Sequence, residues 1–311
     1  MYGDCSRPDF VRFEGTVDHG IDILYTWDID RRLTGVLVDV PCPSQVFELH
    51  NFITADYWGY ARSAIRERLG NIHILPVCGA AGDQNPLDLT RISKNNKNEL
   101  IEWNAQAGEV FRNFDMAEEC QAIAERIADP VCRGVKTAMK NIETYPVFKH
   151  TVKHIDLPIR KVTQEEYIEA DACVKKIISE FSPEKRMTGK DLVRVFEPMG
   201  IVSRWRLQQE MQRNNKTSHS IQSNIIKLGS AAFCTNPFEL FVEYGLRIRA
   251  RSTASQVFIM QLTNGSSGYL PTEAALAGGS YSSKPASTLV GPDGGKILTE
   301  ILIEEINKLW E

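Results

Sequence analysis

Several features that assign a protein to a class are missing from this chain. No stretch reaches the roughly 18 unbroken apolar residues of a membrane-spanning helix, and Met1 to Asp9 has neither the basic nor the apolar segment of a secretory signal. The 36 basic and 40 acidic residues leave a net charge of −4, so the chain has no overall positive charge that would attract nucleic acid. We therefore expect a soluble chain that binds no nucleic acid and has no transmembrane segment, and the sequence leaves localisation and oligomeric state open.

Paired cysteines are missing as well. The seven cysteines are odd in number and scattered, with no Cys-x-x-Cys pair, so neither a disulfide framework nor a cysteine zinc site is indicated. What the chain does have is length and apolar content. Its 311 residues, 42% of them hydrophobic, can bury a large core in one big domain or two smaller ones.

The first third alternates between strand and helix patterns. Apolar runs predict strands over 21–27 and 33–40, joined as a hairpin by a polar turn, and the second run is apolar on both faces, as in a central strand. A helix over 56–69 and a strand over 72–77 follow. This order is typical of an α/β fold, with a mixed sheet and flanking helices.

The middle third reads as a helical excursion, over about 94–214. It begins with a polar, Asn-rich segment over 94–114, and Thr163 with Glu166 forms a capping box. Two prolines interrupt the helical patterns. Pro130 is expected to kink or split the helix over 116–141, and Pro198-Met199-Gly200 to break the helical stretch over 184–214. The expected elements are a helix over 116–141, a strand over 150–160, a helix from the capping box to 181 and a charged helical stretch over 184–214.

Polar side chains follow three of the predicted strands. After 72–77 comes Gly79-Ala80-Ala81-Gly82, whose small residues let a ligand approach the backbone, and then Asp83, Gln84 and Asn85. An ordinary turn, in which Asp83 and Asn85 bond their own backbone, explains the same residues. The other two polar ends are Pro41-Cys42-Pro43-Ser44-Gln45 after 33–40, and 263–273 after a strand over 257–262.

Two further side chains stand out in the last third. A hairpin over 221–234 leads into Glu239, at or just before a helix over 240–251, and Tyr269 lies in the loop over 263–273. Each has a plain structural explanation. Glu239 can cap the helix, and Tyr269 can be a packed aromatic whose hydroxyl finds a partner.

Taken in order, these segments resemble the neutral/alkaline, non-lysosomal ceramidase family. The resemblance rests on Gly82-Asp83-x-x-Pro86, Pro237-Phe238-Glu239, Asn264-x-x-x-Gly268-Tyr269-x-x-Thr272, Tyr281 and Ser287-Thr288-Leu289-x-Gly291-Pro292. It implies an α/β catalytic domain that binds zinc and hydrolyses the amide bond of N-acylsphingosines, a reaction of sphingolipid metabolism. It further implies that Glu239 and Tyr269 are zinc ligands, that Tyr281 assists catalysis, and that Gly82, Gln84, Asn264 and Gly268 lie at the substrate.

The sequence departs from the family pattern at several points. Asn85 stands where the family has a catalytic serine, and an amide cannot act as a nucleophile although it can donate a hydrogen bond to an oxyanion. The family's zinc histidines are not found: the end of the strand over 33–40 reads Val40-Pro41-Cys42-Pro43-Ser44, without a histidine, and the His-x-His segment would precede Met1. We therefore expect one ceramidase-like domain over 1–311, incomplete at its N-terminus and without the family's C-terminal immunoglobulin-like domain. It is either a shortened member or a branch that lost the zinc chemistry.

Four side chains are candidates to complete a zinc site with Glu239 and Tyr269: Asp83, Cys42, His19 and His50. For the histidines a surface or core role is the alternative, and Cys42 is alternatively a nucleophile activated by a histidine. Two functions remain open. One is a metal-dependent hydrolase of an amide or related acyl bond in a small or lipid-like molecule, with Asp83, Asn85 and Tyr281 at the reacting group. The other is a non-catalytic relative that binds such a ligand.

Overall fold

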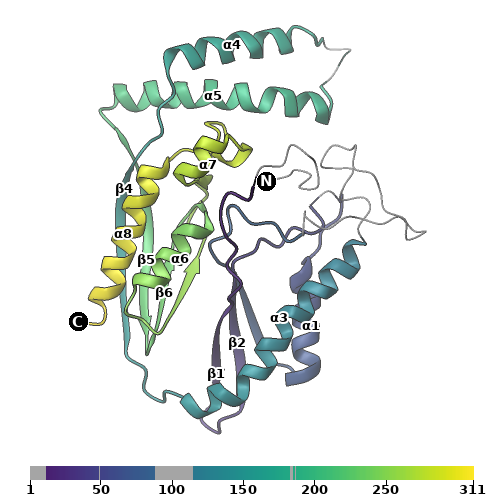
Figure 1. The fold of residues 1–311 in the computed structure, drawn as a ribbon, viewed down its shortest axis with the longest axis vertical. Helices are drawn as coiled ribbons and strands as arrows, with labels where there is room; N and C mark the ends of the chain where they lie inside the picture. Colours follow the sequence, from purple (N-terminus) through teal and green to yellow (C-terminus); the bar gives the residue numbers. More distant parts are fainter. Residues whose placement is uncertain (1–11, 49, 88–114, 183–184, 186) are drawn as a thin grey trace.

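The structure is a computed structural model and describes residues 12–48, 50–87, 115–182, 185 and 187–311. Two β-sheets lie side by side, each with its own helices, and a pair of helices extends away from them (Figure 1). The polar segment expected over 94–114 lies outside the described residues. None of the described helices is long and apolar enough to cross a membrane.

The first sheet has the order β1-β2-β3, formed by β1 (Asp22–Trp27), β2 (Leu33–Val40) and β3 (His73–Cys78). β1 and β2 form the expected antiparallel hairpin, and β2 is central, pairing in parallel with β3. Helices α1 (Tyr57–Leu69) and α3 (Met116–Ala138) pack with β2 in one apolar cluster. Pro130 lies inside α3 without splitting it, and a short 3₁₀ turn, η2 (Met139–Asn141), follows.

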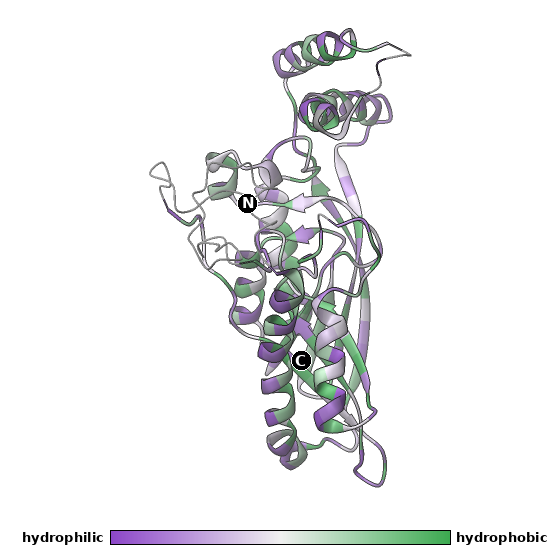
Figure 2. Cartoon of the chain, turned by 90° about the vertical axis from the view of Figure 1, so that its right-hand side faces the viewer, coloured by the Kyte–Doolittle hydropathy of each residue, from purple (hydrophilic) through white to green (hydrophobic). Residues whose placement is uncertain are grey.

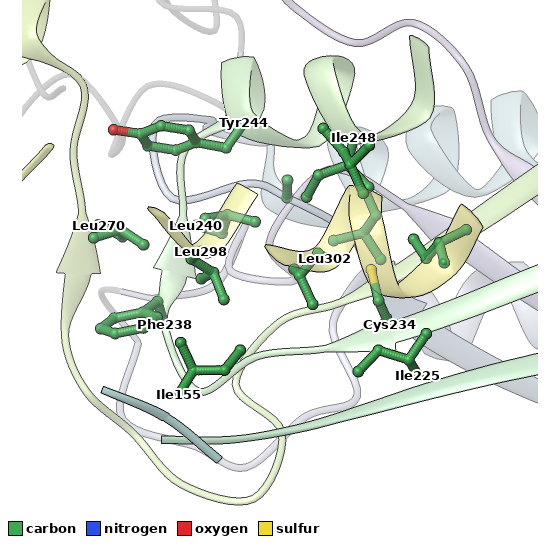
Figure 3. Packing of buried hydrophobic residues seen from close by; sticks show 14 of the residues in the cluster. Ile155, Ile225, Cys234, Phe238, Leu240, Tyr244, Ile248, Leu270, Leu298 and Leu302 are labelled. Atoms are coloured by element: carbon green, nitrogen blue, oxygen red, sulfur yellow. The ribbon is translucent and has the colours of Figure 1, made fainter. Parts of the chain in front are cut away.

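The second sheet has the order β4-β5-β6-β8. Its strands are β4 (Phe148–Pro158), β5 (Ser218–Leu228), β6 (Ala231–Thr235) and β8 (Gln256–Met260). β4, β5 and β6 are antiparallel neighbours, as the predicted hairpin requires, and β6 pairs in parallel with β8. Helices α6 (Val242–Arg251) and α8 (Pro292–Lys308) bury their apolar sides against it, and Figure 3 shows Ile248, Leu298 and Leu302 in this core.

Helices α4 (Gln164–Ile178) and α5 (Gly189–Arg213) form the projecting pair (Figures 1 and 2). The capping box of Thr163 and Glu166 begins α4 as predicted. The expected break at Pro198 is wrong, because α5 runs through it. A proline removes one backbone hydrogen bond from a helix, and here packing against α4 through Val195 and Val202 holds the two flanking halves in one helix.

The two sheets are joined along β8. The backbone N–H of Ile259 donates to the carboxylate of Asp39 on β2 (3.0 Å), and that of Gln261 donates to the carbonyl of Cys78 on β3 (3.2 Å). Arg249 of α6 lies beside Asp39 and pairs with Asp18 and Asp22. Charged side chains therefore fix the position of the first sheet relative to the second.

Candidate functional site

Two very short strands build the backbone of the candidate site. β7 (Glu239–Leu240) and β9 (Tyr269–Leu270) pair in parallel, so that Glu239 lies opposite Tyr269. The Tyr269 N–H donates to the carbonyl of Ser287 (3.0 Å), and Gly268 forms a bridge with Thr288. Three segments that are far apart in the sequence are thus hydrogen-bonded side by side.

Alternation along β7 separates its core side from its polar side. Phe238 and Leu240 are fully buried and, with Leu270, point into the core of the second sheet (Figure 3). Because successive side chains of a strand point to opposite faces, Glu239 is directed away from that core. This places its carboxylate on the same side as the Tyr269 hydroxyl, to which it is hydrogen-bonded.

Tyr281 completes a chain of three groups. It lies in the 3₁₀ turn η3 (Tyr281–Ser283), after α7 (Glu273–Gly278), and its hydroxyl is 2.6 Å from that of Tyr269. The two rings meet edge to face, with centroids 5.5 Å apart. Tyr281 is 38% exposed, whereas Glu239 and Tyr269 are half-buried. The chain therefore runs from a partly desolvated carboxylate to a phenol that a ligand can reach.

Desolvation raises the pKa of all three groups. For Glu239 burial raises the pKa, and the hydrogen bond from Tyr269 partly offsets this. Burial raises the pKa of Tyr269 well above its usual range, and its hydrogen bonds to Tyr281 and Glu239 raise it further. Burial also raises the pKa of Tyr281. At neutral pH both phenols therefore keep their protons and act as hydrogen-bond donors.

The segment after β3 lies directly against β7. The N–H of Gly82 donates to the carbonyl of Leu240 (2.8 Å), and a Cβ at Gly82 would lie only 2.2 Å from the carbonyl oxygen of Glu239. Glycine is needed at this position because the backbone of β7, which carries Glu239, packs too closely against it to leave room for a Cβ atom. Gly82 supports the site through this contact.

Asp83, rather than Glu239, caps the helix that follows β7. Helix α6 begins at Val242, three residues after Glu239, and the Val242 N–H donates to the Asp83 carboxylate (2.8 Å). The expected helix start at 240 is wrong, because Glu239 and Leu240 pair with β9 instead. Burial raises the pKa of Asp83, and this hydrogen bond partly offsets the effect.

Gln261 is a buried residue of this region that the sequence did not single out. Its side-chain oxygen accepts hydrogen bonds from the N–H groups of Ala81 (3.2 Å) and Leu240 (3.1 Å), and its amide nitrogen lies 3.3 Å from the Cys78 sulfur. It thereby ties the end of β8 to the segments carrying Gly82 and Glu239. The available signal was its place at a strand end, like the residues that were chosen.

The other residues expected at the reacting group or the substrate lie in local turns and loops. The Asn85 side chain accepts a hydrogen bond from the N–H of Leu87 (2.9 Å), as in the ordinary turn, and Gln84 bonds Asp83. Asn264 and Gly268 have positive φ values of 60° and 73°, so both serve the tight path of the loop before β9. Of these four, Gly268 is bonded to the site through its backbone, because its carbonyl accepts the Glu239 N–H (3.0 Å). No described hydrogen bond links Gln84, Asn85 or Asn264 to Glu239, Tyr269 or Tyr281.

The proposed substitute metal ligands do not gather around Glu239. His19 and His50 are exposed, and His50 packs against Phe47 and Phe52 instead. Burial raises the pKa of the Cys42 thiol to about 12, which is opposite to the change that activates a nucleophile.

A zinc ion needs about four donors. Within the described part of the chain, no group of three or more His, Cys, Asp or Glu side chains is placed to hold a metal ion. Glu239 and Tyr269 supply two oxygens only. By themselves these two residues therefore do not form a complete zinc site.

Comparison of the sequence with family models and with curated proteins finds no match. Comparison with solved structures finds matches. Neutral ceramidase from Pseudomonas aeruginosa superimposes with a TM-score of 0.59 at 16% identity, over 97% of this chain and 48% of that one. A structure of ceramidase complexed with C2 gives 0.60 and 16%, over 98% and 50%. This chain spans about half the length of these two structures, and its fold is a ceramidase-like α/β fold.

Proposed function

We propose that the chain is a hydrolase of ceramidase type, acting on the amide or a related acyl bond of a small or lipid-like molecule. The observation that supports this is the hydrogen-bonded chain of Glu239, Tyr269 and Tyr281 in a ceramidase-like fold. A carboxylate and two phenols at the ends of separate segments match the needs of acyl transfer, namely a base and a donor to the developing oxyanion.

Each of the three residues has a role that its surroundings favour. In the ligand-free chain Tyr269 donates to Glu239 and accepts from Tyr281, the most exposed of the three. When a ligand binds, the Tyr281 hydroxyl turns its proton from Tyr269 to the carbonyl oxygen, where negative charge develops. Tyr269 orients Tyr281 and is held by Glu239. Glu239 accepts a proton from the attacking water, whose oxygen bonds the carbonyl carbon. The carbon–nitrogen bond then breaks, and the leaving amine takes up the proton that Glu239 received from the water, which restores the carboxylate. Desolvation makes this carboxylate a stronger base.

Whether the chain binds zinc can be tested by measuring its metal content. Elemental mass spectrometry on protein purified without a metal-binding tag gives the metal content directly. Near-stoichiometric zinc would mean that further side chains bind the ion together with Glu239 and Tyr269. Protein that cleaves an acyl amide with no bound metal, even after incubation with zinc, would favour water activation by Glu239 alone.

A second candidate is a ligand-binding relative that does not cleave. It is favoured by Asn85, which stands at the family's serine position and whose side chain is engaged in a turn. In this case Tyr281 and Tyr269 recognise the carbonyl of the ligand and no bond is broken. Fold alone does not separate the two, because one fold can carry a rebuilt site.

The deciding experiment compares Tyr281→Phe and Glu239→Gln with the parent chain. Rates of release of free amine from a panel of N-acyl amines should fall roughly 10²-fold or more in both, since each loses transition-state stabilisation. Tyr145→Phe is the matched control, because Tyr145 is 95% exposed and far along the chain from the site.

Full activity in Tyr281→Phe would refute the proposed role of the phenol. Saturable binding of an N-acyl amine that both variants weaken, with no cleavage by the parent chain, would favour the ligand-binding candidate. Neither cleavage nor binding by a correctly folded parent chain would contradict both candidates.

A further inference from the structure

Two arginines from distant parts of the sequence meet on one turn. Arg160, just after β4, donates from Nη1 to the carbonyl of Ser283 and to the Thr288 hydroxyl (2.9 Å). Arg204, on α5, donates from Nη2 to the carbonyl of Pro285 (3.4 Å). Since Pro285 lies between Ser283 and Thr288, both guanidinium groups contact the same turn, over 283–288.

Neither arginine has a carboxylate partner among the described salt bridges. Burial lowers the pKa of both side chains, and the charge of Arg160 lowers that of Arg204 further. The charge of Glu166 acts on Arg160, but the Glu166 carboxylate already accepts the Thr163 N–H in the capping box. Two partly desolvated guanidinium groups, neither in a described salt bridge with a carboxylate, therefore repel one another, and a bound anion would offset this repulsion.

One polar atom of Arg204 and one of the turn over 283–288 are buried and have no hydrogen-bond partner in the structure. They are Nε of Arg204 and the hydroxyl oxygen of Ser287. Buried polar groups are nearly always bonded, so each unpartnered one calls for an explanation. Both can donate a hydrogen bond. The pair thus offers unused donors beside two cations that lack a counter-charge.

We propose that Arg160, Arg204 and Ser287 form a binding site for a phosphate-type oxyanion, with Thr288 holding Arg160 in place through its hydroxyl oxygen. An anion here neutralises the two guanidinium groups and satisfies the unpartnered donors in one step. The donors come from β4, α5 and the turn over 283–288, so they approach from several directions. That arrangement suits the oxygens of a tetrahedral group, whereas a planar carboxylate has only two oxygens in one plane. We name Arg160, Arg204 and Ser287 the oxyanion cluster.

The position of the oxyanion cluster gives the ligand a structural role. The turn over 283–288 follows Tyr281 directly, and the Ser287 carbonyl accepts the N–H of Tyr269. α5 is fixed to the same turn, because the Lys284 ammonium pairs with Glu197 (2.6 Å) and a Cβ at Gly200 would lie 2.3 Å from that of Ala286. A bound oxyanion would therefore hold the projecting helices, the turn and β4 together.

The test is a titration of the full chain with sodium phosphate at fixed ionic strength, followed by thermal unfolding and isothermal calorimetry. Sodium sulfate and O-phosphoethanolamine are titrated in parallel. We expect a saturable rise in unfolding temperature for the parent chain. Arg160→Gln and Arg204→Gln should each weaken phosphate binding at least tenfold. The matched control is Arg206→Gln, because Arg206 is an exposed residue of the same helix, and it should bind phosphate like the parent.

Further variants keep the test decisive if an arginine replacement fails to fold. Arg204→Lys retains the charge but loses the planar fork, and Ser287→Ala removes one unpartnered donor, so each should weaken phosphate several-fold. Tighter binding of O-phosphoethanolamine than of phosphate would identify a phosphate ester as the ligand, and equal binding would identify the free ion. No saturable response to any of the three anions, or an unchanged response in both Arg204→Lys and Ser287→Ala, would overturn the proposal.

Discussion

A single methyl group at position 82 should disturb the whole candidate site. In Gly82→Ala the added Cβ would lie 2.2 Å from the carbonyl oxygen of Glu239, 2.6 Å from its carbonyl carbon and 3.1 Å from that of Leu240. All three atoms are backbone, so no side chain can rotate away. To reach an ordinary contact β7 must shift by roughly 1 Å, or the Gly82 hydrogen bond to Leu240 must break.

The size of the effect follows from this overlap. Forcing an extra carbon into a packed region costs about 1–3 kcal/mol, and the backbone clash here points to the upper half of that range. With roughly 2.1 cal/mol/K of unfolding entropy per residue, a loss of about 2.5 kcal/mol in a chain of 311 residues lowers the unfolding temperature by about 4 °C. The displaced Glu239 should also lose its alignment with Tyr269.

Thermal and urea unfolding of Gly82→Ala, with near-ultraviolet circular dichroism to follow the tyrosines, would measure both effects. Gly15→Ala is the control, because a Cβ at Gly15 meets nothing within 4 Å. If Gly82→Ala is as stable as the parent within about 0.5 kcal/mol and keeps its tyrosine signal, the close packing of Gly82 on β7 is wrong.

Three further predictions concern the charged groups around the joined sheets. Arg249→Gln leaves the fully buried Asp39 unpaired and should cost about 3–5 kcal/mol in chemical unfolding. Arg251→Gln is the control and should leave the midpoint of chemical unfolding nearly unchanged, because both partners of its ion pair are more than half exposed. Burial raises the pKa of Asp39 to about 7, above its ordinary value, so the folded state binds the extra proton. As the pH rises from 4 to 7, the free energy of unfolding of the parent should therefore fall relative to that of Asp39→Asn, by up to about 1.4 kcal/mol per pH unit. If the difference between the two proteins does not change with pH, the argument from burial of Asp39 is wrong. Asp83→Ala removes the acceptor for the Val242 N–H and should cost about 1 kcal/mol, most of which Asp83→Asn restores; equal losses in both variants would mean that charge, not capping, is what matters.

Periodicity and capping signals predicted most of the local structure from the sequence. The hairpin of β1 and β2, the capping box at Thr163 and the α/β class are all present, because each depends on residues close together in the chain. Propensity failed at Pro198, where packing of α5 on α4 outweighs the lost hydrogen bond. It also failed at the start of α6, because Glu239 and Leu240 have β9 as a partner 30 residues further on.

The candidate site divides in the same way. The sequence selected Glu239, Tyr269 and Tyr281 through its resemblance to a known family, because short motifs around Glu239 and Tyr269, followed by Tyr281, occur in the order of that family. Only the tertiary structure decided that they form one hydrogen-bonded chain and that Asp83 caps α6. It alone brought Arg160 and Arg204 to one turn. The physical reason is that these contacts join groups 12 to 159 residues apart, whose meeting depends on how strands and helices pack, and no local pattern encodes that packing.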